Sequence, residues 1–295
     1  MRKTVRIAAA LAFAAVAALF VAPTATASPA TTQSLETTFF SGTVAAGASQ
    51  TWKWNNANPL SVSYVVGLSP KGASTTQRCE FEVTRTWYQQ NFGGEREFWY
   101  TIKNVGAIAC GTDVMLYSMA NSIGAWSTGG VNAGQSVTKH WNNANPLNAA
   151  YVVGMSPEGA TSTSPCKFEV TRTWYQQQPG GEREFWFTLK NIGTIACSAD
   201  ILMATKTTTT VSGTGTMGAG TTGLWWWNNA NPLSAAYIVG YSPQGATGSA
   251  CQFELFRSWY SQVINSNGAA EREFRYTAGN VGSIACSANR LLATA

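Results

Sequence analysis

The sequence predicts an all-β protein of three tandem β-sandwich units of about 87 residues, each with one internal disulfide. Three observations support this. The segment W-N-N-A-N-P-L recurs from Trp54, Trp141 and Trp227, and two cysteines follow each copy at matching distances. Short runs rich in β-branched and aromatic residues alternate with Gly, Asn and Pro turns, while few stretches show a helical period. Six or seven short strands per unit favour a sandwich.

The repeat also predicts the domain organisation. The units are expected at residues 35–119, 120–206 and 207–295, after a signal peptide at 1–27. The joins are rich in Thr, Ser and Gly but no longer than an ordinary loop. Two arrangements therefore stay open: a chain of three separate sandwiches, which we favour, or three units closed about a pseudo-threefold axis.

The N-terminus has the pattern of a secretory signal. Arg2, Lys3 and Arg6 precede an apolar run over 7–22, and Ala25-Thr26-Ala27 offers the small residues of a cleavage site. We place the cleavage after Ala27. No later segment has the roughly 18 uninterrupted apolar residues of a membrane span. The mature chain is expected to be secreted and extracellular, and not to be an integral membrane protein.

Charge and composition narrow the functional classes. Removing the three basic signal residues from the formal charge of +5 leaves +2. A nucleic-acid binder needs clustered Lys and Arg, so nucleic acid is not an expected partner. Charged residues make up 11% of the chain and aromatic residues 12%. This balance is typical of a secreted β-protein with aromatic surfaces.

The cysteines are read as disulfides because the chain carries an export signal. Each unit holds two cysteines, and pairing within a unit is the simplest of the 15 arrangements. The expected bridges are Cys79–Cys110, Cys166–Cys197 and Cys251–Cys286. Each closes a loop of about 30 residues and contributes about 3 to 4 kcal/mol on the chain-entropy estimate.

A hairpin is predicted around Gly93-Gly94. Pairing Gln90 with Glu95 places Trp87 opposite Phe98, Arg85 opposite Tyr100 and Val83 opposite Ile102 on one apolar face. The same register puts Arg172 opposite Phe187 and Arg257 opposite Tyr276 in the other copies, with Ser266-Asn267-Gly268 at the third turn. The three arginines would then lie on an apolar face and need a partner, which a Glu or an aromatic face supplies.

The segment F-W-Y-T-I-K-N-V-G-A-I-A, residues 98–109, resembles the strand, N-x-G turn and strand of bacterial immunoglobulin-like adhesion repeats. The resemblance implies a β-sandwich and an extracellular recognition role. It covers about a dozen residues per copy, includes neither the cysteines nor W-N-N-A-N-P-L, and transfers no functional residue.

The residue types in the chain give little support to an enzymatic function. His140 is the one histidine, at a position that other copies fill with Lys53 and Trp226, and we interpret it as an incidental surface residue. Paired cysteines offer neither a nucleophile nor a metal ligand. Glu95 and Glu97, two apart on one strand, are about 7 Å apart on one face, a spacing that glycosidases use. They flank an arginine near a turn, so we expect no catalytic residue, metal or cofactor.

W-N-N-A-N-P-L is the candidate binding segment. Asn amides donate to and accept from sugar hydroxyls, and a Trp ring offers an apolar face that stacks on a sugar. A purely structural turn is the alternative, since Asn and Pro form turns. The candidate ligand-binding residues are Trp54, Asn55, Asn56, Asn58, Trp141, Asn142, Asn143, Asn145, Trp227, Asn228, Asn229 and Asn231.

We therefore expect a multivalent, lectin-like binding protein for carbohydrate or a cell-envelope polymer. The alternative is a structural or protein-interaction module, such as a coat component or protease inhibitor, that uses the hairpin tips at 91–94 and 178–181. A glycoside hydrolase is a third and less favoured hypothesis. The sequence names neither a ligand nor an oligomeric state.

Overall fold

A computed structural model describes residues 33–295, except 56, 143, 145–146, 229 and 231–234. The expected signal peptide lies outside the described residues. The described residues of each predicted unit form six strands. Unit 1 contains β1 (Gln33–Phe40), β2 (Ser49–Trp54), β3 (Val62–Lys71), β4 (Cys79–Gln90), β5 (Arg96–Asn104) and β6 (Gly111–Ala120).

The other two units repeat this strand order. Unit 2 contains β7 (Ile123–Ser127), β8 (Ser136–Trp141), β9 (Ala149–Glu158), β10 (Cys166–Gln177), β11 (Arg183–Asn191) and β12 (Ser198–Thr207). Unit 3 contains β13 (Thr209–Gly213), β14 (Thr222–Trp227), β15 (Tyr237–Gln244), β16 (Cys251–Ile264), β17 (Ala270–Asn280) and β18 (Ser287–Thr294). The all-β fold class is thus confirmed. Over the described residues, no helix is long and apolar enough to span a membrane.

Each unit is built from two antiparallel layers. In unit 1, β1, β6 and β3 form one three-stranded sheet, while β2 and β4 flank β5 in the other. Aromatic side chains fill the space between them, for example Tyr64 from β3 stacked on Phe98 from β5 with ring centroids 5.1 Å apart. Alternate residues of β5 point into this core, so Phe98, Tyr100 and Ile102 are almost fully buried. This alternation is what a half-buried strand requires.

The three disulfides form within the units, as predicted. Cys79 pairs with Cys110, Cys166 with Cys197 and Cys251 with Cys286. All six cysteines are buried at the start of the long hairpin strand and just before the last strand of each unit. The bridges therefore join the two layers of each sandwich, and their presence indicates an oxidising environment.

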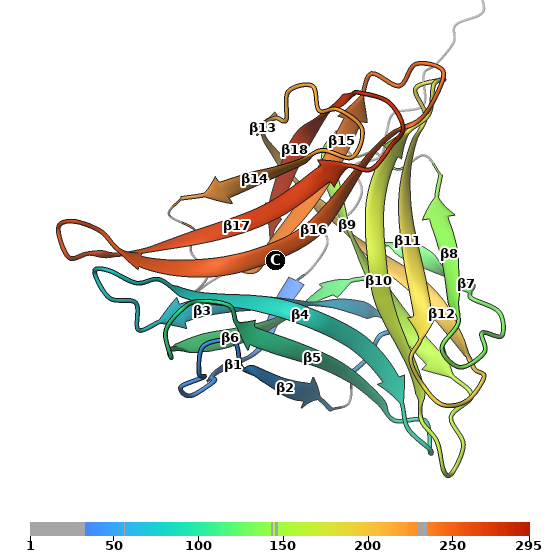
Figure 1. Ribbon diagram of the computed structural model, residues 1–295. Helices are drawn as coiled ribbons and strands as arrows, with labels where there is room; N and C mark the ends of the chain where they lie inside the picture. The colour runs from blue at the N-terminus through green and yellow to red at the C-terminus, as the bar shows by residue number, and fades with distance from the viewer. Residues whose placement is uncertain (1–32, 56, 143, 145–146, 229, 231–234) are drawn as a thin grey trace, which may run out of the picture. The chain divides into compact units, whose positions relative to one another are not determined.

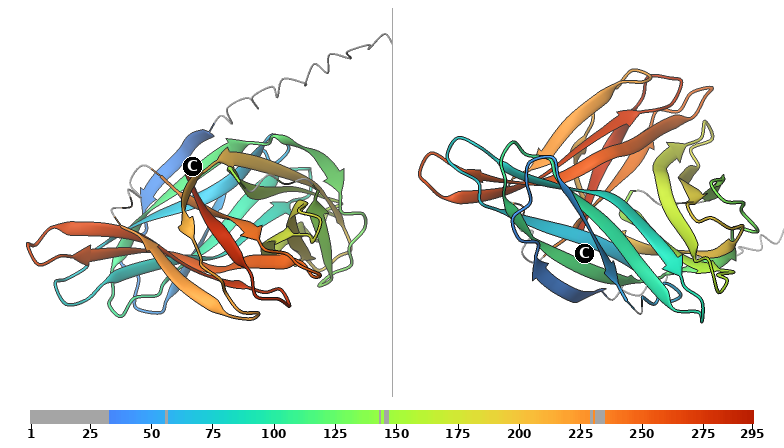
Figure 2. Two further views of the ribbon diagram at one scale, coloured as in Figure 1. Left: turned by 90° about the horizontal axis from the view of Figure 1, so that it is seen from above. Right: turned by 60° about the horizontal axis from the view of Figure 1, so that its bottom comes forward.

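The units do not stand apart, because their long hairpins pair with one another in a closed ring (Figure 1). The end of β4 pairs with the start of β10, the end of β10 with the start of β16, and the end of β16 with the start of β4. The same three hairpins are seen from two further sides in Figure 2. Of the two arrangements left open by the sequence, the structure has the closed, pseudo-threefold one.

Small residues let the units approach closely on their inner strands. A Cβ atom added to Gly67 of β3 would lie 3.0 Å from Cβ of Ala236, and one added to Gly240 of β15 would lie 3.2 Å from Cβ of Ala150. The third member of the set is Gly154 of β9, where the added atom would lie 2.5 Å from Oγ of Ser63. Each glycine thus faces the preceding unit around the ring, and no side chain fits there without displacement.

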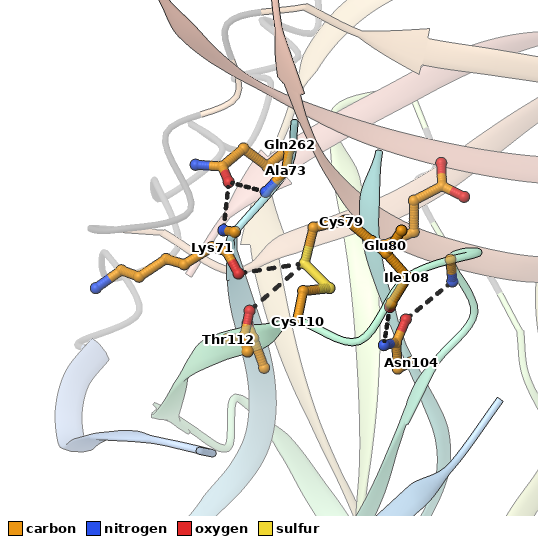
Figure 3. The surroundings of a disulfide bond; sticks show 12 residues. Lys71, Ala73, Cys79, Glu80, Asn104, Ile108, Cys110, Thr112 and Gln262 are labelled. Carbon is orange, nitrogen blue, oxygen red and sulfur yellow. Dashed lines mark hydrogen bonds between the residues drawn. A yellow bond between two sulfur atoms is a disulfide. The ribbon is translucent and has the colours of Figure 1, made fainter. Parts of the chain in front are cut away.

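Polar contacts close the same ring from unit to unit. Gln262 of unit 3 lies beside the Cys79–Cys110 bridge of unit 1, where its Oε1 accepts hydrogen bonds from the backbone N–H groups of Gly72 (2.9 Å) and Ala73 (3.1 Å) (Figure 3). Gln90 of unit 1 accepts from Ala160 in unit 2, and Gln177 of unit 2 accepts from Ala246 in unit 3. These glutamines end β4 and β10 and lie near the end of β16.

The predicted hairpin register is right at one end and wrong at the other. Val83 lies opposite Ile102 as expected, but Gln90 pairs with Arg96 and Arg85 with Thr101. A β-bulge between Val83 and Arg85 inserts one extra residue, which shifts the pairing by one toward the turn. The extra residue also reverses the alternation of side chains along β4. Beyond the bulge, Tyr88 points into the core, whereas Arg85 and Trp87 do not.

The same shift corrects the other two hairpins. Arg172 lies opposite Thr188 rather than Phe187, and Arg257 lies opposite Thr277 rather than Tyr276. Ser266-Asn267-Gly268 does form the third turn, between the paired residues Ile264 and Ala270.

Candidate functional site

In unit 1 the described residues of W-N-N-A-N-P-L begin at Trp54, the last residue of β2, and lead toward β3, and backbone N–H groups hold them in place. The N–H of Ala57 donates to the carbonyl oxygen of Arg96 at 2.9 Å, and the N–H of Asn58 donates to the Tyr64 hydroxyl at 2.9 Å. Ala57 and its counterparts Ala144 and Ala230 are buried. The middle of the segment therefore anchors the loop to the core, which is the structural part of its role.

The flanking side chains of this loop face outward. Asn55 and Asn58 are exposed, as are Asn142 and Asn228 in the other units. Within the described part of the chain, the amide groups of Asn55 and Asn58 form no hydrogen bond, so both are free to contact a ligand. Asn56, Asn143, Asn145, Asn229 and Asn231 lie outside the described residues.

A groove of about 670 Å³ opens beside Trp54 in unit 1, and we call it the Trp54 groove. It lies between the end of β2 and the sheet β1-β6-β3, and all three strands of that sheet contribute lining residues. Its walls combine aromatic rings, amides, hydroxyls and two charged groups. The lining residues are Glu36, Lys53, Trp54, Asn55, Asn58, Ser61, Val62, Tyr64 and Ser118.

The corresponding Trp also lines a hollow in each of the other units. In unit 2 a hollow of about 520 Å³ is formed by Trp126, His140, Trp141 and Asn142. In unit 3 a groove of about 370 Å³ lies beside Trp227 and Tyr237, which correspond to Trp54 and Tyr64. Its remaining lining residues are Lys206, Thr207, Thr209, Leu292, Ala293 and Thr294. The structure thus places each predicted Trp at a concave surface.

The three Trp rings differ in exposure. Trp54 and Trp141 are partly buried and pack against the hydrophobic core, whereas Trp227 is 41% exposed. Trp226 lies next to it on β14 and is 54% exposed, but successive strand residues point to opposite faces. Trp226 therefore belongs to the outer face of its sheet, on which the hairpin tryptophans also lie.

Glu97, one of the two candidate acidic residues, is held in a tight hydrogen-bond cluster. It is 5% exposed and accepts from Lys53 Nζ (2.5 Å), Trp99 Nε1 (2.9 Å) and Gln89 Nε2 (3.1 Å). Burial by itself raises the pKa of the Glu97 carboxyl, but the hydrogen bonds from Lys53 and Trp99 and the positive charge of Lys53 outweigh it, so this pKa is lowered. A general acid at neutral pH needs the opposite shift.

The corresponding carboxylates are bound in similar clusters. Glu184 accepts from Gln176, Gln178 and the indole of Trp186, and Glu273 accepts from Arg78 and Arg275. Glu95 is exposed at the turn. The arrangement therefore uses Glu97, Glu184 and Glu273 as hydrogen-bond acceptors that organise the outer face of each hairpin.

The arginines expected on an apolar face lie on the outer face instead, because the bulge moves them there. The Arg85 guanidinium lies 5.1 Å from the Trp87 ring and pairs with Glu169 of unit 2 at 2.8 Å. Arg172 pairs in the same way with Glu254 of unit 3, and Arg257 with Glu82 of unit 1. The partners are of the expected kind, but they connect successive units.

Two features of the site could not be read from a single copy of the repeat. Glu169, Gln90 and their counterparts act across units, and their recurrence at the repeat period was the available signal. Nothing in the sequence pointed to Glu36 of the Trp54 groove, because no Glu recurs at the equivalent position of the other units. His140, expected to be an incidental surface residue, stacks on Trp186 with ring centroids 4.3 Å apart and lines the unit 2 hollow.

Nothing matched when the chain was compared with protein-family models, with curated proteins and with solved structures. Over the described residues, no group of three His, Cys, Asp or Glu side chains is arranged to hold a metal ion. The fold and the site define an all-β protein of three disulfide-bridged units closed about a common axis. Each unit has a concave surface beside a repeated Trp.

Proposed function

We propose that this protein is a secreted, multivalent carbohydrate-binding protein whose sites are the concave surfaces beside Trp54, Trp141 and Trp227. The observation that carries the proposal is the composition of the Trp54 groove. Two aromatic residues lie beside two amides with no partner among the described residues, together with hydroxyl and charged groups. This is the combination that recognises sugars, with apolar ring faces and polar equatorial groups.

The arrangement of the units supports multivalency. One chain presents three related surfaces on a single closed scaffold, so the second and third contacts with a polymer are intramolecular. Such linkage raises binding to a repeating ligand by roughly 10² to 10⁴ over a single site when the sites engage together. The three disulfides and the basic, then apolar N-terminal segment support an extracellular location.

The test is binding of the full-length chain to a panel of immobilised polysaccharides. Trp54→Ala, Trp141→Ala and Trp227→Ala are expected to weaken binding to the preferred polymer by about tenfold each, and the triple variant by 10² or more. Trp226→Ala is the matched control, because this residue is at least as exposed but lies on the other face of β14. Binding by the intact chain should also be displaced by soluble oligosaccharide.

Three results would contradict the proposal. A folded chain that binds no polysaccharide excludes the function. A folded triple variant that binds as well as the intact chain excludes these sites, and an effect of Trp226→Ala alone moves the site to the outer face. Binding to protein partners through the hairpin tip, where Phe92 is 69% exposed, would favour the interaction-module alternative.

A further inference from the structure

The three concave surfaces differ in the charged residues that line them. Glu36 lines the Trp54 groove. In unit 2 the residue at the repeat spacing of 87 is Ile123, and Thr205, the counterpart of Ser118, contacts Ser122 instead, with 2.8 Å between Thr205 Oγ1 and Ser122 Oγ. The described lining of the unit 3 groove includes Lys206 and no carboxylate. Among the described residues that line these three surfaces, Glu36 is therefore the one carboxylate.

The backbone places Glu36 for this role. The pairing of β1 with β6 is regular up to Leu35 and shifts by one residue before Thr37, so Glu36 is the extra residue of a β-bulge. Bulges of this kind redirect a side chain and are common beside binding sites. The result is a carboxylate at the groove, close to the aromatic rings of Trp54 and Tyr64.

The net unpaired charge of the Trp54 groove depends on which of its two charged residues already has a partner of opposite charge. Glu36 Oε1 accepts hydrogen bonds from the hydroxyls of Ser34 and Ser118, each at 2.5 Å. No ion pair to Glu36 is formed by the described residues. Lys53, the other charged lining residue, is paired with Glu97 at 2.5 Å. The unpaired charge in the Trp54 groove is thus negative.

The negative charge of Glu36 also acts on Tyr64, another residue that lines the groove. Burial raises the pKa of the Tyr64 hydroxyl, the hydrogen bond from Asn58 lowers it, and the negative charge of Glu36 adds to the rise. A half-buried carboxylate beside aromatic rings attracts a cation in two ways, by charge-assisted hydrogen bonding and by cation–π attraction.

We propose that the Trp54 groove selects a sugar residue that carries a protonated amino group, such as glucosamine in a deacetylated polysaccharide. The ammonium group pairs with Glu36, while Asn55 and Asn58 bind hydroxyls and Trp54 contacts the ring. An N-acetylated sugar has no positive charge at this position and leaves Glu36 unpaired. The inference rests on the proposed carbohydrate-binding function and adds the ligand class to one of its sites.

The experiment compares a glucosamine oligomer with its fully N-acetylated counterpart of equal length, using calorimetric titration of the full-length protein at a pH where the amine is protonated. The intact chain should bind the glucosamine oligomer about tenfold more tightly, since a charge-assisted hydrogen bond contributes roughly 1.5 kcal/mol or more. Glu36→Gln keeps an acceptor for Ser34 and Ser118 but removes the charge, so it should abolish the preference.

Glu182→Gln is the matched control, because Glu182 is an exposed carboxylate at the hairpin turn of unit 2 and does not line the groove. It should preserve the preference. Equal binding of the two oligomers by the intact chain, or an unchanged preference in Glu36→Gln, overturns the inference. Loss of binding to both oligomers in Trp54→Ala would still support a sugar site. A folded chain that binds neither these oligomers nor any other polysaccharide overturns the proposed function as well.

Discussion

At the level of single residues, the carboxylates of this protein fall into two groups that differ in how many partners they have. Most carboxylates are paired or saturated with hydrogen bonds, as Glu97 is by Lys53, Trp99 and Gln89. Glu36 accepts only from two hydroxyls within the described residues. Residues of the first kind stabilise the outer hairpin face, whereas Glu36 is left with capacity for a ligand. The hydrogen-bond and ion-pair partners of a carboxylate, rather than its burial alone, distinguish a stabilising residue such as Glu97 from a ligand-binding candidate such as Glu36.

The lowered pKa of Glu97 makes a prediction about acid stability. The carboxyl is ionised to lower pH in the folded chain than at its unfolded value of 4.5, so it stabilises the fold above that pH. This contribution is lost as the pH falls through the folded pKa. We expect the free energy of unfolding of the intact chain to fall more steeply than that of Glu97→Gln from neutral pH to well below 4.5.

Urea unfolding over this pH range measures the effect. Glu95→Gln, two residues away and exposed, is the matched control, because Glu95 makes none of the hydrogen bonds of Glu97. A parallel pH dependence in the intact chain and in Glu97→Gln would show that the cluster adds no pH-dependent stability.

At the scale of elements, the long hairpins carry the most information, and one bulge accounts for the part of the register that sequence reasoning missed. Strict alternation from Val83 puts Arg85 and Trp87 on the core face. One inserted residue reverses the alternation, so that they lie outside and pair across units. Strand alternation is readable from the sequence, but a bulge without a glycine leaves no mark in it.

Removal of a disulfide should show how much each bridge stabilises the closed scaffold. Cys79 and Cys110 are 31 residues apart, so the double variant Cys79→Ala and Cys110→Ala should lower the free energy of unfolding by about 3 to 4 kcal/mol. Equilibrium denaturation in urea measures it. The equivalent pair in unit 2, Cys166 and Cys197, has the same separation and should cost a similar amount. A loss below about 1 kcal/mol would contradict the chain-entropy argument.

At the scale of the whole molecule, the three units are coupled through backbone pairing, close glycine contacts and ion pairs that link each unit to the next. The core of all three is continuous, since residues from every unit belong to one hydrophobic cluster. A second cluster joins the inner strands of all three units, including Met119, Ala150 and Ala236. The described chain should therefore unfold as one body.

The substitution Gly67→Val tests this coupling. The new side chain would collide with Ala236 of unit 3 and should destabilise the protein by about 1 to 3 kcal/mol. Calorimetry should show a single transition at a lower temperature, because units 1 and 3 melt together. Gly130→Val is the control, since nothing lies within 4 Å of an added Cβ there. Two separated transitions, with one unshifted, would mean that the units fold independently.

Four features could be predicted from the residues alone: the strand content, the threefold repeat, the position of each Trp next to a turn, and the bridges Cys79–Cys110, Cys166–Cys197 and Cys251–Cys286. They follow from the alternation of apolar and polar residues, from turn-forming residues and from the repeat period, all of which are visible in the linear sequence. The local part of the hairpin register, such as Val83 opposite Ile102, belongs to the same class.

The way in which the units join, and the side chains that meet in the grooves, could be seen only in the folded chain. Pairing of β4 with both β10 and β16, the contact of Gly67 with Ala236, and the approach of Glu36 to Trp54 and Tyr64 connect residues that are distant in the chain. Contacts of this kind depend on packing in three dimensions. The repeat is compatible both with separate sandwiches and with a closed ring, because its period defines the length of a unit and not the surface on which the units meet.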